Sequence, residues 1–404
     1  MLTEWYPQQL LEFEMPNFQL RNDLEQLSIV YQHGVPEATV FYSGRILEAL
    51  SSSAVEALGG KAKANVFANL EYIDDFHFLD PVTRYWAHAL RRMGNQVRHI
   101  LGPLEADAHH VAIALLDTWL KWYFIQYPLG PSLPSFSQRQ ESQLDIFKIF
   151  NQLSQQLSNT DFNAELFNQQ HSDILLHPAL VSVIIEKLLD RKDYTVADQL
   201  ILQALERSPS DLRLIQLQGL SMSRQNHLKQ ACQILSQLNK RFPNDDETMG
   251  ILGGVYKRMW SESGNSQHLQ RAGKLYEQGW RNSKQRNAYL GINAASIKLW
   301  QNQADSAKEI ASAITEQFEL KQNILKEKFP NEPFRLNFWD QETLAQAAFL
   351  AGKEQDSVAL YKELLDPKRH PDKPFNVVIG QLKQHFAHMP PSNELLSLIN
   401  SVAE

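Results

Sequence analysis

The chain has 404 residues, of which 43% are hydrophobic and 21% are charged, and its formal net charge is −7. This length allows two or three domains with sizeable cores, and the negative charge argues against a general nucleic-acid-binding surface. The single cysteine, Cys232, excludes an internal disulfide framework and a zinc site built from cysteines. No apolar segment approaches the ~18 residues of a membrane span, and the N-terminal stretch lacks the basic start of a secretion signal. We therefore expect a cytoplasmic protein that does not enter a membrane.

Residues 1–127 predict a helical bundle. Apolar residues recur at helical spacing in two stretches, 20–31 and 35–58, and the pair Gly59-Gly60 predicts the end of the second helix. Asp80-Pro81 is typical of a helix start and begins a third predicted helix, which reaches about Ile100. A fourth predicted helix covers residues 105–127. We therefore predict an all-α unit of four helices.

A segment rich in proline and serine, residues 128–140, follows the predicted bundle. Its thirteen residues include three prolines, one glycine and three serines, a composition typical of linkers. Residues 141–177 are polar and rich in glutamine and asparagine, and they predict helices. Because the terminal unit of a stacked array needs a polar outer face, we expect these helices to cap the array that follows.

From residue 178 the chain repeats with a period of 34 residues. Pro209 and Pro243 stand 34 positions apart, and so do Gly219 and Gly253. This period is the signature of the tetratricopeptide repeat, a helix–turn–helix unit in which a proline ends the second helix. Such units stack into a solenoid with a concave binding surface. We predict a solenoid of this kind for residues 178–404.

The third repeat, which begins at Asp246, departs from the regular pattern. It contains an insertion over residues 261–269, and two looser units follow it, one around residues 289–291 and one over residues 342–365. The insertion marks the part of the array that differs most from plain repeats, so we expect partner recognition near it.

Three blocks of this region are more specific than a generic repeat: ETMGILGGVYKRMW (247–260), LYEQGW (275–280) and YLGINAASIKLW (289–300). Over roughly residues 180–390 the chain resembles the TRAF-binding, repeat-containing domain of the apoptosis signal-regulating kinases. Bacterial relatives of that domain occur beside effector domains in systems of immunity and programmed death. No kinase domain accompanies the resemblance, so it implies only an adaptor that binds a partner protein. The candidate binding residues in these blocks are Tyr256, Lys257, Tyr276, Trp280 and Asn293.

The predicted third helix of the bundle carries the motif RRMGNQVRH over residues 91–99. Arg91, Asn95 and His99 are spaced at i, i+4 and i+8, so they lie within an arc of about 80° on one helix face. They could hold a neighbouring helix by hydrogen bonds, line a ligand-sensing pocket, or act together in catalysis.

Together with RILEAL at residues 45–50, this motif resembles the R-x-x-G-N-x-x-x-H branch of the HEPN superfamily. In HEPN ribonucleases a histidine exchanges a proton with the ribose hydroxyl and an arginine steadies the phosphate, at the interface of two domains. The usual nuclease motif has arginine directly before the polar residue. Here that position is Gly94, and this departure weakens the expectation of RNA cleavage.

We expect an adaptor or sensor in a prokaryotic immunity or stress-signalling assembly, whose solenoid binds a partner protein and whose bundle dimerises or senses. The alternative is a HEPN-type RNase toxin or effector, a metal-independent endoribonuclease that its solenoid regulates, with Arg91, Asn95 and His99 as catalytic residues. A plain assembly scaffold is a third interpretation. The sequence contains no phosphate-binding glycine loop and no convincing pair of catalytic carboxylates, so we expect no cofactor and no metal.

Overall fold

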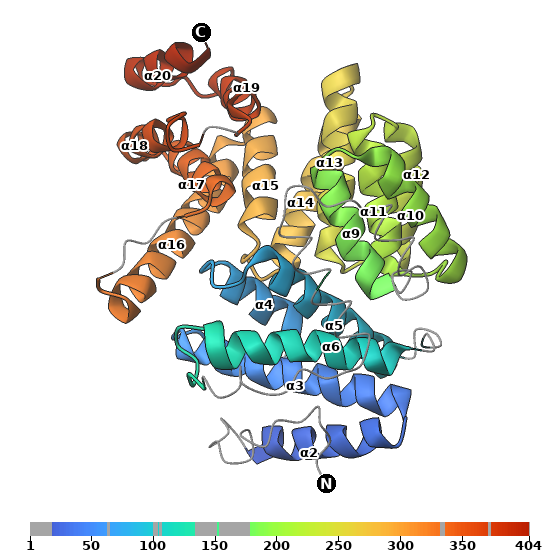
Figure 1. Cartoon of the computed structure of the whole chain (residues 1–404). Coiled ribbons are helices and arrows are strands. Elements are labelled where there is room, and N and C mark those ends of the chain that lie inside the picture. The colour runs from blue at the N-terminus through green and yellow to red at the C-terminus, as the bar shows by residue number, and fades with distance from the viewer. Residues whose placement is uncertain are drawn as a thin grey trace. The chain divides into compact units, whose positions relative to one another are not determined.

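The computed structural model describes residues 18–62, 65–99, 104, 107–133, 152, 178–331, 336–370 and 373–403. Within these residues every regular element is a helix, which confirms the all-α prediction (Figure 1). The chain divides into two compact units, Met1–Ser221 and Met222–Glu404. The predicted capping helices of residues 141–177 lie outside the described residues, apart from Gln152, and the predicted linker is described only as far as Leu133.

The bundle begins the first unit, and α3 lies at its centre. Its elements are α2 (Phe18–Gln32), α3 (Pro36–Ala57), α4 (Val66–Asp74), α5 (Pro81–His99), α6 (Ala108–Lys121) and the π-helix η1 (Trp122–Gln126). Helix α3 packs against α2, α4, α5 and α6, and it runs beside α6 in Figure 1. The helices predicted from residues 20, 35, 81 and 105 are therefore all found.

Helix α4 is an addition that the sequence does not predict. It is short, and its start is fixed by Asn65, whose side chain accepts a hydrogen bond from the backbone N–H of Phe67. Asp80 acts in the same way for α5, where its side chain accepts from the N–H groups of Val82 and Thr83. In the described residues, the bundle therefore has one α-helix more than the four that were predicted.

The repeats follow as helix pairs, in agreement with the predicted solenoid. In chain order the helices are α9 (Pro178–Asp190), α10 (Tyr194–Arg207), α11 (Leu212–Arg224), α12 (Leu228–Arg241), α13 (Asp246–Ser263), α14 (Ser266–Asn282), α15 (Ala288–Trp300), α16 (Ala304–Lys328), α17 (Phe338–Leu350), α18 (Glu354–Leu364), α19 (Phe375–Phe386) and α20 (Asn393–Ala403). Pro209 and Pro243 each stand two residues beyond the end of a second helix, as the repeat pattern predicts.

The predicted insertion at residues 261–269 lengthens helices and does not form a long loop. Helix α13 continues to Ser263, and only Gly264 and Asn265 separate it from α14. Gly264 ends α13 in the left-handed conformation (φ 66°), and the Asn265 side chain accepts from the N–H of Gln267 to begin α14. The third pair is therefore longer than the first two.

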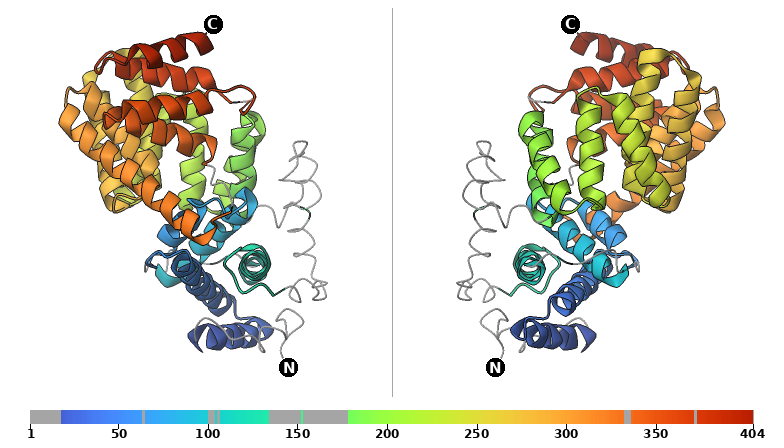
Figure 2. Two further views of the ribbon diagram at one scale, coloured as in Figure 1. Left: turned by 90° about the vertical axis from the view of Figure 1, so that its left-hand side faces the viewer. Right: turned by 90° about the vertical axis from the view of Figure 1, so that its right-hand side faces the viewer.

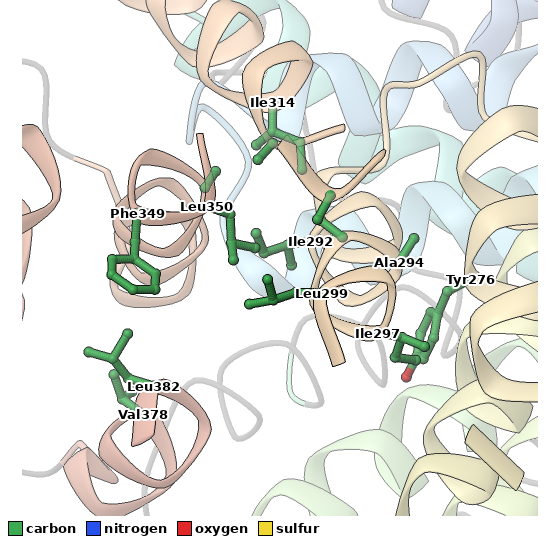
Figure 3. Close-up of a cluster of buried hydrophobic side chains, with 14 of the residues drawn as sticks. Tyr276, Ile292, Ala294, Ile297, Leu299, Ile314, Phe349, Leu350, Val378 and Leu382 are labelled. Carbon is green, nitrogen blue, oxygen red and sulfur yellow. The ribbon is translucent and has the colours of Figure 1, made fainter. Parts of the chain in front are cut away.

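The second unit has a continuous apolar core between successive pairs, and its pairs from α13 to α20 follow one another in both views of Figure 2. Ile292 and Leu299 of α15 lie between the side chains of neighbouring helices (Figure 3). Leu350 of α17 and Leu382 of α19 belong to the same cluster. Helix α15, the first helix of its pair, also packs against α17 and α19, the first helices of the two pairs that follow.

Among the described residues, no helix combines the length and the apolar character needed to cross a bilayer. No group of three His, Cys, Asp or Glu side chains in the same residues is arranged to hold a metal ion.

Candidate functional site

The first helices of successive pairs in the second unit meet through matched side chains. The Lys257 ammonium of α13 donates a hydrogen bond of 2.7 Å to the Asn293 amide oxygen of α15. Further along, one turn beyond Lys257 on α13 and two turns beyond Asn293 on α15, the Trp260 and Trp300 rings stack with their centroids 5.3 Å apart. Helices α15 and α17 are also in contact. These first helices therefore present one shared surface, the side of a repeat stack that usually binds ligands.

Helical spacing selects the residues on this surface. On α15, Tyr289 and Asn293 are four positions apart, and on α17, Trp339 and Glu342 are three apart, so each pair lies on one face of its helix. The Asn293 amide also donates a hydrogen bond of 2.9 Å to the backbone oxygen of Tyr289, which fixes its orientation. We define the inner face as Lys257, Tyr289, Asn293, Trp339 and Glu342.

Two opposite charges lie on the inner face in a partly desolvated setting. Burial lowers the pKa of Lys257 to about 8, even though the Glu342 charge acts in the opposite direction. Burial also raises the pKa of Glu342 to about 7, and there the Lys257 charge acts against the shift. Both side chains still keep partial contact with solvent. Charged pairs with shifted pKa values are typical of functional sites. An apolar pair in the same place would stabilise the fold more, so a charged pair that is kept there usually serves another role.

Beneath these charges is a buried polar layer. The Gln346 amide of α17 donates a 3.3 Å hydrogen bond to the Ser296 hydroxyl of α15 and lies 3.2 Å from Nε2 of His385. Burial lowers the pKa of His385 to about 3, so its ring is neutral and Nε2 can accept from Gln346. The Trp300 ring lies against His385, with centroids 5.5 Å apart. The layer thus joins α15, α17 and α19 under the inner face.

Large aromatic side chains stand exposed on the same face. Tyr289 and Trp339 are each the second residue of their helix, and they are 56% and 51% exposed. Exposed rings on adjacent helices are a common feature of protein-binding surfaces. The rings lie one helical turn, about 5.4 Å, from Asn293 and Glu342.

The five predicted binding residues separate into two groups. Lys257 and Asn293 lie on the inner face and touch each other. Tyr256, Tyr276 and Trp280 are buried among α13, α14 and α15, where they pack between the helices. Tyr276, for example, lies where α13 and α14 cross, since a Cβ added to Gly253 would be 3.0 Å from its ring.

The sequence did not single out Trp339, Glu342, Gln346 or His385 as site residues. The polar and aromatic spacing along α15 and α17 was visible as a helical pattern. However, residue 342 lies far along the chain from residue 257, and only the stacking of the pairs brings the two charges together.

In the first unit, the motif of residues 91–99 lies on α5. Arg91 lies over the Phe67 ring of α4, 5.2 Å from its centroid, and Asn95 follows one turn later and is half-buried. The His99 side chain lies outside the described part of the chain. Arg98, on the same face, donates a 2.7 Å hydrogen bond to the Glu48 carboxylate of α3. The face therefore packs partly against α3 and α4.

Gly94 lies at the crossing of α5 with α3. A Cβ added to Gly94 would be 3.4 Å from the Cα of Gly44, and one added to Gly44 would be 3.3 Å from the Cα of Gly94. The two backbones are therefore in close contact, and a Cβ at Gly44 would need the neighbouring helix to give by a few tenths of an ångström. The position that carries arginine in the usual nuclease motif therefore faces the interior of this bundle.

A family described as "TPR-S: Tetratricopeptide Repeats-Sensor" matches residues 193–298, a stretch that includes Lys257 and Asn293. No curated protein matches the chain significantly. Among solved structures, the chain is similar to the crystal structure of a thermophilic TPR protein in Thermus thermophilus. The two are 14% identical with a TM-score of 0.37, over 50% of this chain and 95% of that chain. Residues 193–298 therefore match a family of tetratricopeptide repeats, and helices α10 to α15 form the helix pairs expected of such repeats.

Proposed function

We propose that this protein is an interaction adaptor with a sensing role, and that its inner face binds a partner protein. The observation that carries this proposal is the partly desolvated pair of Lys257 and Glu342. Two charges kept in such a setting reduce the stability of the free protein, and a partner that complements them would offset that loss. Exposed Tyr289 and Trp339 add apolar contact area beside them.

The resemblance to the TRAF-binding domain of apoptosis signal-regulating kinases supports the adaptor role, and the sensor description of the matching family is consistent with it. We place the adaptor in a prokaryotic immunity or stress-signalling assembly, as the bacterial relatives of that domain suggest. In this proposal the bundle dimerises or senses, while the repeats hold the partner.

The endoribonuclease alternative has less support. Arg91 and Asn95 share a face of α5, as a catalytic role requires, but Arg91 lies against Phe67 and the Arg98 beside them pairs with Glu48. Gly94 is packed against Gly44, so that an added Cβ would already touch the Cα of Gly44 at 3.4 Å. Incubation of the pure protein with total RNA tests this alternative. If the RNA is not cleaved, the result agrees with the proposed adaptor function.

Affinity capture with the full chain tests the proposal when variants are compared. The Tyr289→Ala, Trp339→Ala double variant removes two exposed rings of the inner face, and Leu320→Ala removes an exposed apolar side chain of α16 as the matched control. A partner captured by the wild type and by Leu320→Ala, but lost from the double variant, supports the inner face. A partner that both variants retain equally contradicts it.

A further inference from the structure

The charges of the chain are distributed unevenly along it. Residues 222–300 run from the start of the second unit to the end of α15, and they include twelve Lys or Arg against five Asp or Glu, a net charge of +7. The whole chain has a net charge of −7, so the remaining residues together carry −14. A positive region of this strength in an acidic protein creates a local field that attracts anions.

Helices α12 and α14 carry much of this positive charge on their exposed sides. On α12 the exposed residues are Lys229, Gln230, Gln233, Gln237, Lys240 and Arg241. On α14 they are Ser266, Gln267, Gln270, Arg271, Lys274, Gln278, Arg281 and Asn282. The structure describes both helices in full, and none of these exposed residues is acidic or apolar. We define the outer face as these exposed residues of α12 and α14.

The two helices present their cations in the same direction. Both pack against α13, as the second helices of consecutive pairs (Figure 1). Each buries an alanine, Ala231 on α12 and Ala272 on α14. Nine positions after this alanine each exposes a cation, Lys240 on α12 and Arg281 on α14. Because equivalent positions of stacked repeats point the same way, the cations of both helices belong to one surface.

The next second helix, α16, has a different surface. Its buried alanine is Ala307, and the exposed residue nine positions later is Glu316. Exposed Glu309 and Glu319 stand on the same helix, and Glu319 pairs with Lys353 of α18. The charge of mixed sign on α16 therefore limits the positive surface to α12 and α14.

The positive charge of the outer face is only partly neutralised by the protein itself. The Glu277 carboxylate of α14 is half-buried and pairs with Arg281 and with Lys298 of α15. Lys240 and Lys274 form no ion pair with any described residue. The outer face thus combines cations that lack a counter-charge with amide side chains that can donate hydrogen bonds.

This chemistry matches the phosphate backbone of a nucleic acid. Phosphate oxygens in complexes are contacted by Arg, Lys, Ser, Asn and Gln side chains, the kinds that the outer face exposes. Protein interfaces are anchored by aromatic side chains, and amphipathic membrane-binding helices add apolar ones, but the outer face exposes neither. Single strands are bound by stacking of their bases on aromatic rings. A duplex, whose bases are already stacked, needs no such rings and therefore fits best.

The dimensions of the outer face also suit a duplex. Lys229 and Lys240 are about 16 Å apart along α12, and Arg271 and Arg281 are about 15 Å apart along α14. Packed helices lie about 8–10 Å apart, so two neighbours of α13 lie within about 20 Å of each other. Duplex DNA carries one charge per about 1.7 Å of its axis, so a length of about 16 Å carries roughly nine phosphates, and about half of them face one side. The cations of the outer face are numerous enough to contact these four or five phosphates.

We propose that the outer face binds the phosphate backbone of a double-stranded nucleic acid without reading its sequence. This surface lies on the second helices of the repeats, whereas the inner face lies on first helices. The inference therefore goes beyond the proposed function and does not depend on it. The repeats then carry two binding surfaces, one for the partner protein and one for the duplex.

Fluorescence anisotropy with the full chain and a labelled duplex of about 24 base pairs tests this inference. Duplex DNA, duplex RNA and single strands of the same sequence are titrated at 50 and 200 mM salt. Four or five phosphate contacts predict that duplex affinity falls by more than about a hundredfold between the two salt concentrations. We expect single strands to bind about fivefold more weakly, because they lack the charge density of a duplex. Equal affinity for both duplexes supports recognition of the shared backbone, and a preference for one identifies DNA or RNA as the ligand.

Two matched double variants connect binding to the outer face. Lys240→Glu with Lys274→Glu reverses one exposed lysine on each helix of the outer face. Lys326→Glu with Lys383→Glu reverses two exposed lysines of α16 and α19, and it changes the net charge by the same amount. We expect the first double variant to weaken duplex binding at 50 mM salt by more than about thirtyfold and to reduce the slope of log affinity against log salt by about 2. The second should stay within about threefold of the wild type, and overlapping thermal melts check that both fold.

Several results would overturn the inference. They are absence of duplex binding at 50 mM salt, equal loss of affinity in the two double variants, and tighter binding of single strands than of duplexes. Polyglutamate, or vesicles that contain phosphatidylserine, would also overturn it if they displaced the labelled duplex better than unlabelled duplex does at equal charge. The Tyr289→Ala, Trp339→Ala variant should keep duplex binding, since its substitutions lie on the inner face. Loss of duplex binding in that variant would locate the nucleic acid there and contradict the outer face.

Discussion

Single residues decide how closely the repeat helices approach one another. Gly253 of α13 faces the ring of Tyr276 on α14, and an added Cβ there would be 3.0 Å from ring carbons, which is tighter than ordinary packing. The neighbouring Gly254 would place a Cβ 3.5 Å from the Tyr276 hydroxyl, at a normal contact distance. The two glycines of one helix therefore have different roles, although both stand in the same LGG sequence.

This difference gives a matched pair of substitutions. Gly253→Ala should overpack the crossing, which costs roughly 1–3 kcal/mol of unfolding free energy. Gly254→Ala should be neutral or stabilise by up to about 1 kcal/mol, because alanine favours a helix over glycine. Urea denaturation of both variants measures the difference. If Gly253→Ala is as stable as Gly254→Ala, the crossing is not as close as described.

The charges of the inner face should make stability depend on pH. The folded-state pKa of Glu342 is raised to about 7, which means that the folded protein favours the neutral carboxyl. The stability that this gives is fully present below the ordinary pKa of 4.5 and is lost as pH rises through 7. The folded-state pKa of Lys257 is lowered to about 8, which means that the folded protein favours the neutral amine. The stability that this gives is fully present above the ordinary pKa of 10.5 and is lost as pH falls through 8. Both charges therefore reduce stability between about pH 7 and 8.

Glu342→Gln, which stays neutral, isolates one side of this dependence. Relative to the wild type, we expect the variant to gain unfolding free energy as pH rises from 4.5 to 7.5, by on the order of 1 kcal/mol after solvent screening. Glu319→Gln, at an exposed carboxylate of α16 that pairs with Lys353, is the control and should show little change over the same range. A flat difference between Glu342→Gln and wild type would mean that Glu342 is well solvated.

At the scale of elements, α5 carries the motif that raised the possibility of a nuclease. Substituting Gly94→Arg would restore the usual arginine position, but α3 crosses there and an added Cβ would already lie 3.4 Å from the Cα of Gly44, so a long side chain would press on α3. We expect Gly94→Arg to lower the stability of the bundle by at least roughly 1–3 kcal/mol and to create no RNA cleavage. Gly380→Arg on α19, where no atom lies within 4 Å of an added Cβ, should be tolerated in the same thermal melts.

The wild-type chain should also leave RNA intact. The face of Arg91 and Asn95 packs partly against α3 and α4, as the contacts of Arg91 with Phe67 and of Arg98 with Glu48 demonstrate. The measurement is incubation with total RNA in the presence of a chelator. Metal-independent cleavage that disappears in both Arg91→Ala and His99→Ala would contradict this expectation and favour the endoribonuclease.

Most helices could be predicted from the sequence, because apolar spacing, glycine stops and proline positions act locally. Helix α4 could not, since it is short and its start depends on the side chain of Asn65. The site was predictable only in part. Lys257 and Asn293 stood in specific motifs, but Glu342 reaches the same surface, and His385 the buried layer beneath it, only through packing of distant helices. Aromatic residues such as Tyr276 and Trp280 look alike in sequence whether they fill a core or face a partner.

At the scale of the molecule, the bundle and the first repeats belong to one compact unit, which ends at Ser221. The sequence predicts the boundary earlier, in residues 128–140. Helix α9 of the first repeat packs against α5, and Arg92 donates a 3.0 Å hydrogen bond to the Ser182 hydroxyl across this contact. This contact between the bundle and the first repeat explains why the boundary between the compact units does not lie in the proline- and serine-rich segment.

Hydrogen–deuterium exchange of the full chain, with and without a captured partner, tests the central claim most directly. If the inner face binds the partner, amide protection should increase in the segments around Lys257 of α13, Asn293 of α15 and Glu342 of α17, while the helices of the bundle change little. Protection confined to residues 18–126, with no change in α13, α15 and α17, would contradict the claim that the repeats of the second unit hold the partner.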